Sequence, residues 1–318
     1  MKPASKKSID VLGLGCTTVD DFIHVDSFPP ADSKRRVERT HRQCGGLTGN
    51  ALIAAARLGA RCAYAGCLGT DDFSGYIAQY FTSEGIDISH APRLPEARVI
   101  HSIIVIGGDT GSRNIFYEVN GVVGAHPSLP SEEVIHDSKV LFIDHYGMPG
   151  NLRALKLARA FGVPIVADLE DETVPHFNEV LAGVDHLILS EEFACRFTRE
   201  NNAAAAARAL WRPDRAVVIV TCGKEGCWSL EGAGEPRHRA AFTVRATNTN
   251  GCGDVFHGAY AFRLACGDSL KERIRFASAA AAVKATQSDI PDLPAVEHLL
   301  RKKSDRQPPI EPAAATKL

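Results

Sequence analysis

Residues 248–259, Asn-Thr-Asn-Gly-Cys-Gly-Asp-Val-Phe-His-Gly-Ala, combine the residue types of an anion site with a carboxylate, and they run directly into a helical pattern at 260–266. Gly251 and Gly253 let successive backbone N–H groups point the same way. The first turn of a helix also leaves its N–H groups without intrahelical partners, and the helix dipole is positive there. The stretch therefore predicts a phosphate site at the start of a helix.

Asp254 falls in the first turn of that helix, beside the predicted phosphate site. A carboxylate there can accept the proton of an attacking hydroxyl, the role that an aspartate takes in protein kinases. The helix N-terminus stabilises the ionised carboxylate by about 0.3–1 kcal/mol, which predicts a weak base. A weak base suffices, because the alcohol proton leaves late in phosphoryl transfer. On these few residues alone, an equally good interpretation is a tight glycine turn in which Asp254 merely starts the helix.

Residues 44–59 form a second candidate site, with Gly45 and Gly46 placed before an apolar helical pattern. A glycine pair allows a ligand to approach the backbone closely. Asn50 offers a donor and acceptors for sugar hydroxyls. The alternative makes Asn50 the N-cap of the helix.

The elements that position these residues alternate between short apolar runs and helix-length segments. This order is typical of a parallel sheet with helices on both faces. The expected strands are 9–15, 61–66, 140–143, 164–167, 187–189 and 216–221, and the expected helices include 51–59, 74–84, 151–161 and 203–210.

Two segments depart from this alternation. Residues 22–43 alternate apolar and polar side chains, and residues 98–118 resemble a hairpin that turns at 107–111. They predict a small second sheet that covers a ligand site or a partner subunit. We therefore expect one α/β domain over residues 9–302 with a discontinuous β lid from about 20–44 and 97–120, and flexible tails at 1–8 and 303–318.

The composition excludes several classes of protein. The 318 residues carry 36 Lys and Arg against 38 Asp and Glu, a net charge of −2, so a nucleic-acid partner is not expected. No apolar stretch approaches the roughly 18–20 residues that span a bilayer. The nine cysteines form no C-x-x-C pair, which favours reduced, structural thiols in a cytoplasmic protein. Walker-type loops, H-E-x-x-H and G-x-S-x-G are absent from the sequence.

Taken together, both glycine stretches resemble the two signatures of the ribokinase or PfkB family of carbohydrate kinases. The resemblance extends over nearly the whole chain and includes Asp20, residues 69–75, residues 111–117 and residues 221–226. It implies a three-layer αβα domain with a small β-sheet lid. It also implies an ATP-dependent kinase that uses Mg²⁺ and forms a homodimer through the lid.

The resemblance also implies roles for individual residues. Asp254 would be the catalytic base, and an anion hole would be formed by Gly251, Cys252 and Gly253. The sugar hydroxyls would be held by Asp20, Gly45, Gly46 and Asn50. The nucleotide site would include Ser190, Thr221, Gly223 and Gly226.

This chain departs from the family pattern at positions that affect the cation sites. Asn248 stands where the second signature usually begins with Asp, which argues against the monovalent-cation activation of some relatives. Cys252 replaces an alanine but still supplies a backbone N–H. The family's Asn-x-x-Glu, which helps arrange magnesium, falls at residues 190–193, Ser-Glu-Glu-Phe, and neither end matches. The metal ligands are therefore open, and Asp168 or Glu170 is a hypothesis for them.

Positive side chains crowd the lid, namely Lys34, Arg35, Arg36, Arg39, Arg42 and Arg113. On a strand, Arg35 and Arg39 would share one face while Lys34, Arg36 and Arg42 share the other. A solvated charged edge that resists aggregation is the favoured interpretation. The alternative is a substrate site, with Arg113 contacting an acidic or phosphorylated sugar.

Our functional hypothesis is an ATP-dependent carbohydrate kinase that phosphorylates a hydroxymethyl group of a small sugar. A ketohexose is favoured, because ketohexokinase-like and sulfofructose-kinase-like members look most similar. The alternatives are a nucleoside or sugar-phosphate kinase of the same fold, and a catalytically silent sugar-binding regulatory protein. His257, in the helix after Asp254, is expected to pack or cap rather than to transfer protons.

Overall fold

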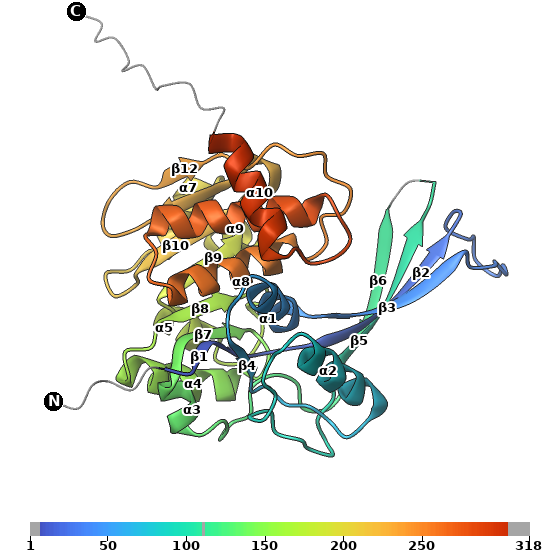
Figure 1. The fold of residues 1–318 in the computed structure, drawn as a ribbon, viewed down its shortest axis with the longest axis horizontal. Helices are drawn as coiled ribbons and strands as arrows, with labels where there is room; N and C mark the ends of the chain where they lie inside the picture. The colour runs from blue at the N-terminus through green and yellow to red at the C-terminus, as the bar shows by residue number, and fades with distance from the viewer. Residues whose placement is uncertain (1–6, 110–111, 305–318) are drawn as a thin grey trace, which may run out of the picture.

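The central element is an eight-stranded sheet, seen in a computed structural model that describes residues 7–109 and 112–304. Its strand order is β12-β11-β10-β9-β8-β7-β1-β4 (Figure 1), and the strands from β10 to β4 are parallel. The bounds are β1 (Ile9–Leu14), β4 (Cys62–Tyr64), β7 (Ser138–Asp144), β8 (Ile165–Asp168), β9 (His186–Ser190), β10 (Val217–Thr221), β11 (Cys227–Leu230) and β12 (Arg237–Arg239).

Helices cover both faces of this sheet, because successive side chains of each buried strand point to opposite sides. In β10, Val217 and Ile219 join one apolar core while Val218 and Val220 join the other. The first core is closed by α1 (Leu47–Arg57), α2 (Asp72–Ser83), α8 (Cys252–Ala265), α9 (Leu270–Ala285) and α10 (Leu293–Ser304). The second is closed by α3 (Glu132–His136), α4 (Met148–Ala160), α5 (Phe177–Gly183), α6 (Glu191–Thr198) and α7 (Ala203–Leu210). The predicted three-layer α/β fold is confirmed.

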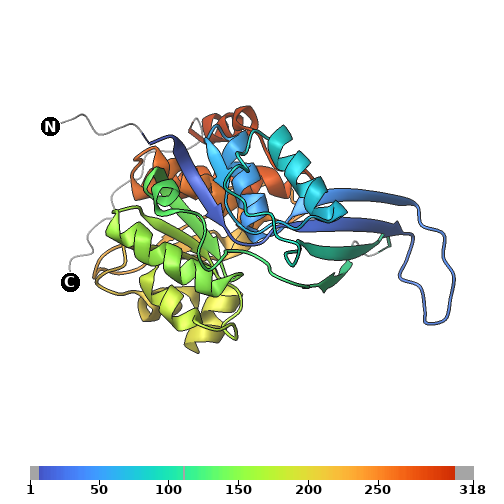
Figure 2. The same cartoon turned by 90° about the horizontal axis from the view of Figure 1, so that it is seen from below.

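The second sheet is the predicted lid. It contains β2 (Thr18–Val25), β3 (Arg39–Gly45), β5 (Ile100–Gly107) and β6 (Arg113–Glu118) in the order β3-β2-β5-β6. The lid extends away from the main sheet as a separate layer (Figures 1 and 2). β5 and β6 pair as the expected hairpin, although the turn predicted at 107–111 includes residues 110 and 111, which lie outside the described residues.

The lid cations at 34–36 lie in a loop rather than on a strand, so their predicted division between two strand faces is wrong. Pro29 and Pro30 precede them, and proline lacks the N–H that a β-ladder requires. Asp32 then adopts a left-handed backbone with φ 56°. The extended pattern therefore resumes only at Arg39.

A few residues of the expected tails, 7–8 and 303–304, belong to the described structure. Lys7 Nζ donates to the carbonyl of Ser138 at 2.8 Å, and the N–H of Ser8 donates to the Asp137 carboxylate at 3.0 Å. Helix α10 continues to Ser304. Residues 1–6 and 305–318, which carry the rest of the expected tails, lie outside the described part of the chain.

A buried carboxylate joins three elements at the point where the sheet changes its direction of winding. From β1 the parallel sheet grows toward β4 on one side and toward β7 on the other. Asp144, at the end of β7, accepts hydrogen bonds from the Cys16 N–H, the Thr48 hydroxyl and the Tyr146 N–H, each at 2.8 Å. Ligand sites of open α/β sheets form at such a switch point, and here the Asp144 bonds fix the start of α1 beside it.

Helix α8 lies directly against α1 because Gly258 lacks a side chain. A Cβ atom added at Gly258 would overlap the carbonyl oxygen of Ala51. This close approach brings the first turn of α8 beside the first turn of α1, where Asn50 lies.

Gly258→Ala is therefore expected to destabilise the protein by about 1–3 kcal/mol, the usual cost of overpacking, and to lower its melting temperature by several degrees. Gly75→Ala is the matched control, since Gly75 also lies in a helix but nothing lies within 4 Å of an added Cβ. That control should be neutral or stabilising. Thermal unfolding of both variants checks this, and equal melting temperatures would contradict it.

Candidate active site

A cleft of about 500 Å³ lies between the lid and the carboxyl ends of the central strands. From the lid and its base it is lined by Cys16, Thr18, Asp20, Ile100, Ser102, Ile104, Ile115 and Tyr117. From the main domain it is lined by Gly46, Leu47, Asn50, His145, Tyr146, Glu170, Asp171, Asn250, Gly251 and Asp254. The cleft therefore unites segments that are more than 200 residues apart in the sequence.

Asp254 and Asn50 meet directly in this cleft. Asn50 Nδ2 donates a hydrogen bond of 2.6 Å to Asp254 Oδ2. Gly251, with φ 72°, is the N-cap of α8, and the left-handed backbone there favours glycine. Helix α1 begins at Leu47 with Gly46 as its N-cap, so the interpretation of Asn50 as a cap is wrong. Asn50 lies inside the helix and faces the cleft.

The surroundings of Asp254 make it a stronger base than its place at a helix N-terminus predicts. Burial raises the pKa of Asp254 to about 7, assisted by repulsion from the neighbouring carboxyl groups of Asp168 and Glu170. The hydrogen bond from Asn50 and the nearby His257 act in the opposite direction and are outweighed. The expectation of a weak base is therefore corrected, because desolvation is larger than the helix-dipole effect. A carboxylate with a pKa near 7 is suited to general base catalysis at neutral pH.

His257 anchors α8 to the sheet beneath Asp254. Its Nδ1 lies 2.8 Å from the carbonyl oxygen of Gly253, and its Nε2 lies 3.0 Å from the carbonyl oxygen of Ile188. The ring is 3% exposed, and Nδ1 also lies 3.3 Å from Asp168 Oδ2. These contacts agree with the packing role predicted for His257.

The two candidate metal ligands differ in their access to the cleft. Asp168 is buried beside His257, and burial with the charges of Glu170 and Asp144 raises the pKa of its carboxyl well above the usual range. Glu170 is exposed and lines the cleft. Within residues 7–109 and 112–304, no cluster of three or more His, Cys, Asp or Glu side chains has metal-site geometry. Magnesium is commonly held by one or two carboxylates plus substrate phosphates, so Glu170 fits it better than Asp168 does.

Asp20 lies on β2 and faces the same cleft as Asp254. Burial raises the pKa of Asp20, while the nearby Thr18 and Ser102 hydroxyls partly oppose that shift. Gly45 does not line this cleft; a Cβ added there would overlap the Asp20 carboxylate, so its missing side chain makes room for Asp20. Gly46 does line the cleft and has φ 90°.

The predicted nucleotide-site residues lie together at the ends of neighbouring strands, outside the cleft that holds Asp254. Thr221 pairs with Ser190 in the parallel register of β10 and β9. The Ser190 hydroxyl accepts from the Phe193 N–H at 3.2 Å and caps α6. Gly223 and Gly226 follow β10 in positive-φ conformations, and a Cβ at Gly226 would overlap the Arg239 carbonyl oxygen.

The lid cations that the structure describes are engaged within the lid or exposed. Arg42 forms two 2.7 Å hydrogen bonds with the Asp21 carboxylate and lies over the Phe73 ring. Arg39 lies 3.1 Å from the His24 ring. Arg113 is exposed on β6. It is two residues before Ile115 and therefore on the same face of the strand, but unlike Ile115 it does not line the cleft.

Several cleft residues were not predicted from the sequence. His145 and Tyr146 follow β7, and Asp171 follows β8. Their position in the sequence could have predicted them, because polar side chains that directly follow an apolar strand lie at the carboxyl edge of a parallel sheet. Lys284, which lines a smaller cleft nearby, had no such signal, since it lies in an alanine-rich helix.

The remaining expectations concern thiols and membranes. All nine cysteines are free, and five of them are buried. Among the described residues, no helix is both long and apolar enough to cross a bilayer.

A doubly wound α/β domain that holds a half-buried carboxylate at a glycine-rich helix start, under a β lid, defines a phosphotransferase with an alcohol acceptor. The model of the pfkB family of carbohydrate kinases matches residues 7–293. The chain belongs to this family and is an ATP-dependent sugar kinase.

Individual relatives agree with this assignment. The ribokinase of Haemophilus influenzae is 28% identical over 300 residues, which cover 90% of this chain and 96% of that protein. A crystal structure from Agrobacterium tumefaciens, assigned as a ribokinase, has a TM-score of 0.87 and 26% identity, covering 94% of this chain and 99% of that one. The Arabidopsis thaliana ribokinase, solved with ribose and ATP, shares the fold with a TM-score of 0.79 and 20% identity, covering 92% and 99%.

The pH dependence of kcat/KM should report the ionisation of Asp254, because the base must be deprotonated to accept a proton. With the pKa raised to about 7, kcat/KM should fall as the pH drops through about 7 and level off above it. Steady-state assays from pH 5 to 9 measure this limb. A limb near pH 4, the range of an ordinary aspartate, would contradict the account of Asp254.

Proposed function

We propose that this kinase transfers the γ-phosphoryl group of ATP to a hydroxymethyl group of a small neutral sugar, with a ketohexose favoured. The observation that carries the proposal is the cleft shared by Asp254, Asn50 and Asp20. Of these three residues, only Asp254 lies in the first turn of α8, directly after the Gly251-Cys252-Gly253 turn. It can therefore contact a hydroxyl and a phosphate at once.

In the proposed mechanism, Asp254 accepts the proton of the sugar hydroxyl as that oxygen attacks the phosphorus. Asn50 orients the Asp254 carboxylate through its 2.6 Å hydrogen bond. Backbone N–H groups of residues 251–253 hold the transferred phosphoryl group and oppose its developing charge. Asp20 accepts hydrogen bonds from other sugar hydroxyls. Closure of the lid excludes water that would otherwise hydrolyse ATP.

The charge of the cleft favours a neutral sugar over an acidic or phosphorylated one. Its lining includes the carboxylates of Asp20, Glu170, Asp171 and Asp254, and no Lys or Arg among the described residues lines it. Carboxylates accept hydrogen bonds from hydroxyls and repel a substrate phosphate. Arg113 would have to move into the cleft to serve the alternative of an acidic substrate.

The nucleotide is proposed to bind beside Ser190, Thr221, Gly223 and Gly226, at the carboxyl ends of β9 and β10. Family members use ATP with Mg²⁺. Glu170 is proposed to hold the metal with the phosphates, and the bound Mg²⁺ would neutralise phosphate charge during transfer.

Activity on a panel of sugars tests the proposed function. ATP, Mg²⁺ and the purified protein should release ADP with ketohexoses or similar neutral sugars faster than with sugar phosphates, sugar acids or nucleosides. Asp254→Asn should retain ligand-induced thermal stabilisation while turnover falls by at least about a hundredfold. Thermal stabilisation by sugar without ADP release from the native protein would instead support a silent sugar-binding protein. Unchanged turnover in Asp254→Asn would refute the assigned base.

Glu170→Gln tests the proposed metal ligand. We expect the Mg²⁺ concentration for half-maximal activity to rise by about tenfold, because one carboxylate is lost from the metal's ligands. The control is Glu192→Gln, in the exposed first turn of α6, where the family's usual metal motif falls. This variant should leave the Mg²⁺ concentration for half-maximal activity unchanged. An Mg²⁺ requirement raised by Glu192→Gln and not by Glu170→Gln would reverse the assignment.

We also propose that two copies pair through the outer lid face, where Ile103 and Phe116 are adjacent across β5 and β6 and are 39% and 61% exposed. An apolar sheet face that remains exposed favours association. Light scattering should give a dimer for the native protein and a monomer for Phe116→Glu. Leu129→Glu, which changes an apolar residue of 40% exposure outside the lid, should remain dimeric. A native monomer would exclude this pairing.

A further inference from the structure

Lys284 is a buried cation near the glycine turn that precedes Asp254. It lies in the last turn of α9 and is only 4% exposed. It lines a second, small cleft of about 70 Å³, together with Asn248, Asn250 and Gly251. The Lys284 side chain therefore lies behind the glycine turn that precedes Asp254.

The position of Gly251 shows how close these groups are. A Cβ atom built on Gly251 would lie 3.5 Å from Asn50 Nδ2, 3.7 Å from Asp254 Oδ2 and 3.9 Å from Lys284 Cε. The Asn50 amide, the Asp254 carboxylate and the Lys284 side chain thus lie around the side of Gly251 where a side chain would project. The turn itself is held to α9, because the N–H groups of Thr247 and Asn248 donate to the Ala285 carbonyl at 2.7 and 3.1 Å.

Lys284 lacks a close counter-charge among the described residues. Its Nζ donates to the Gln287 carbonyl at 3.4 Å, and no described carboxylate oxygen lies within 4.0 Å. Burial lowers the pKa of Lys284, which reflects the cost of keeping this charge out of water. A buried charge is normally paired, so a site that leaves one unpaired is complementary to an incoming anion.

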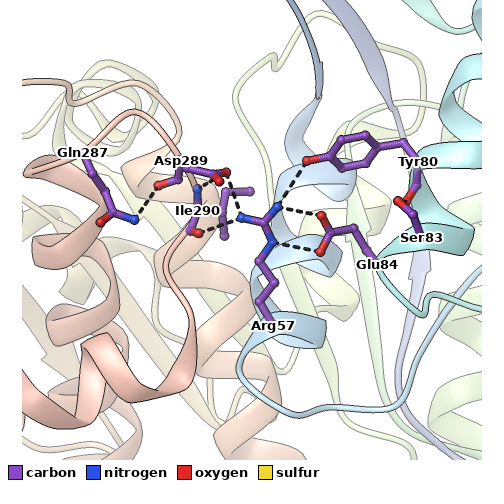
Figure 3. A network of polar contacts seen from close by, with 7 residues as sticks. All are labelled: Arg57, Tyr80, Ser83, Glu84, Gln287, Asp289 and Ile290. Atoms are coloured by element: carbon purple, nitrogen blue, oxygen red, sulfur yellow. Dashed lines mark hydrogen bonds and ion pairs between the residues drawn. The ribbon is translucent and has the colours of Figure 1, made fainter.

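The carboxylate of Asp289, in the loop that follows α9, is bound by Arg57 and not by Lys284. Arg57 donates to Asp289 Oδ1 and to the Ile290 carbonyl, both at 2.8 Å, and its other N–H groups bind the Glu84 carboxylate at 2.8 and 2.6 Å (Figure 3). Gln287 Nε2 donates to the Asp289 carbonyl at 3.1 Å. This network fixes the loop that follows α9 and directs Asp289 toward Arg57. Lys284 is left facing the glycine turn.

We propose that Lys284 is a positioning residue that supplies a fixed positive charge behind the anion hole, where it stabilises the phosphoryl group held by residues 251–253. This inference rests on the anion-hole role proposed above. Lys284 acts through the glycine turn and does not contact the sugar. The competing, purely structural role is that of a cation that stabilises the C-terminus of α9.

The positive charge should also affect Asp254. The charges that act on Lys284 are those of Asp254 from α8, Asp289 from the following loop and Arg113 from the lid. The Cys252 thiol on α8 is also near, but burial raises its pKa, so it is uncharged at neutral pH. Those acting on Asp254 include Asp168, Glu170 and His257, with a hydrogen bond from Asn50. Because the Lys284 charge favours the ionised carboxylate, its removal should raise the pKa of Asp254 and move the acid limb of kcat/KM to higher pH.

The test compares Lys284→Met with Lys284→Arg and with Lys271→Met, which removes an exposed lysine at the start of the same helix. We expect Lys284→Met to lower kcat at least tenfold, with little change in the sugar KM, and to shift the acid limb upward. Lys284→Arg should keep most of the activity because it keeps the charge. Lys271→Met should resemble the native protein. If Lys284→Met does not fold, activity and the acid limb in Lys284→Gln relative to Lys284→Arg provide the same comparison.

A folded Lys284→Met protein with native kcat and an unmoved acid limb would overturn the proposal. Equal losses in Lys284→Met and Lys284→Arg, without a pH shift, would also overturn it in favour of the structural role. Asp254→Asn is assayed in parallel. If Asp254→Asn remains active, the proposed function fails; if Asp254→Asn is inactive while Lys284→Met is native, only the role of Lys284 fails.

Discussion

The arrangement of the site depends on the buried carboxylate of Asp144. It lies at the switch point of the sheet and accepts hydrogen bonds from the chain just after β1, from the first turn of α1 and from the chain just after β7. Each of these donors would be costly to bury without an acceptor. Asp144 therefore determines where α1 begins, and α1 in turn carries Asn50 to Asp254. The close contact at Gly258 completes this geometry by bringing α8 against α1.

The site places carboxylates that bind protons next to positive groups that bind anions. Carboxylates of Asp168, Glu170 and Asp254 are gathered in a partly desolvated region, which raises the affinity of Asp254 for protons. On the other side of the glycine turn, the Lys284 side chain adds a positive charge to that of the backbone N–H groups, and both attract negative charge. A proton acceptor is thus placed beside an anion site, as phosphoryl transfer from a nucleotide to an alcohol requires.

The sequence predicted the structure well at positions where a residue type has few physical explanations. Glycines beside Asp254 and the glycine pair before α1 predicted both halves of the site, and short apolar runs predicted the strands. Asn50 was harder to interpret, because a polar residue near a helix start is as consistent with a cap as with a ligand. Residues 34–36 were predicted on a strand because their charge pattern was considered without the two prolines before them.

Other features depend on contacts that no local pattern contains. The high pKa of Asp254 arises from burial in the assembled cleft, assisted by Asp168 and Glu170, which lie more than 80 residues earlier in the chain. Lys284 is an ordinary helix residue in the sequence and becomes a buried charge only through the packing of α8 and α9.

A crystal structure with a sugar substrate and a non-hydrolysable ATP analogue tests the central claim most directly. The account predicts the acceptor hydroxyl within about 3.2 Å of an Asp254 carboxylate oxygen, and the terminal phosphate against the N–H groups of residues 251–253. A sugar bound away from Asp254, or a terminal phosphate bound away from those N–H groups, would contradict it.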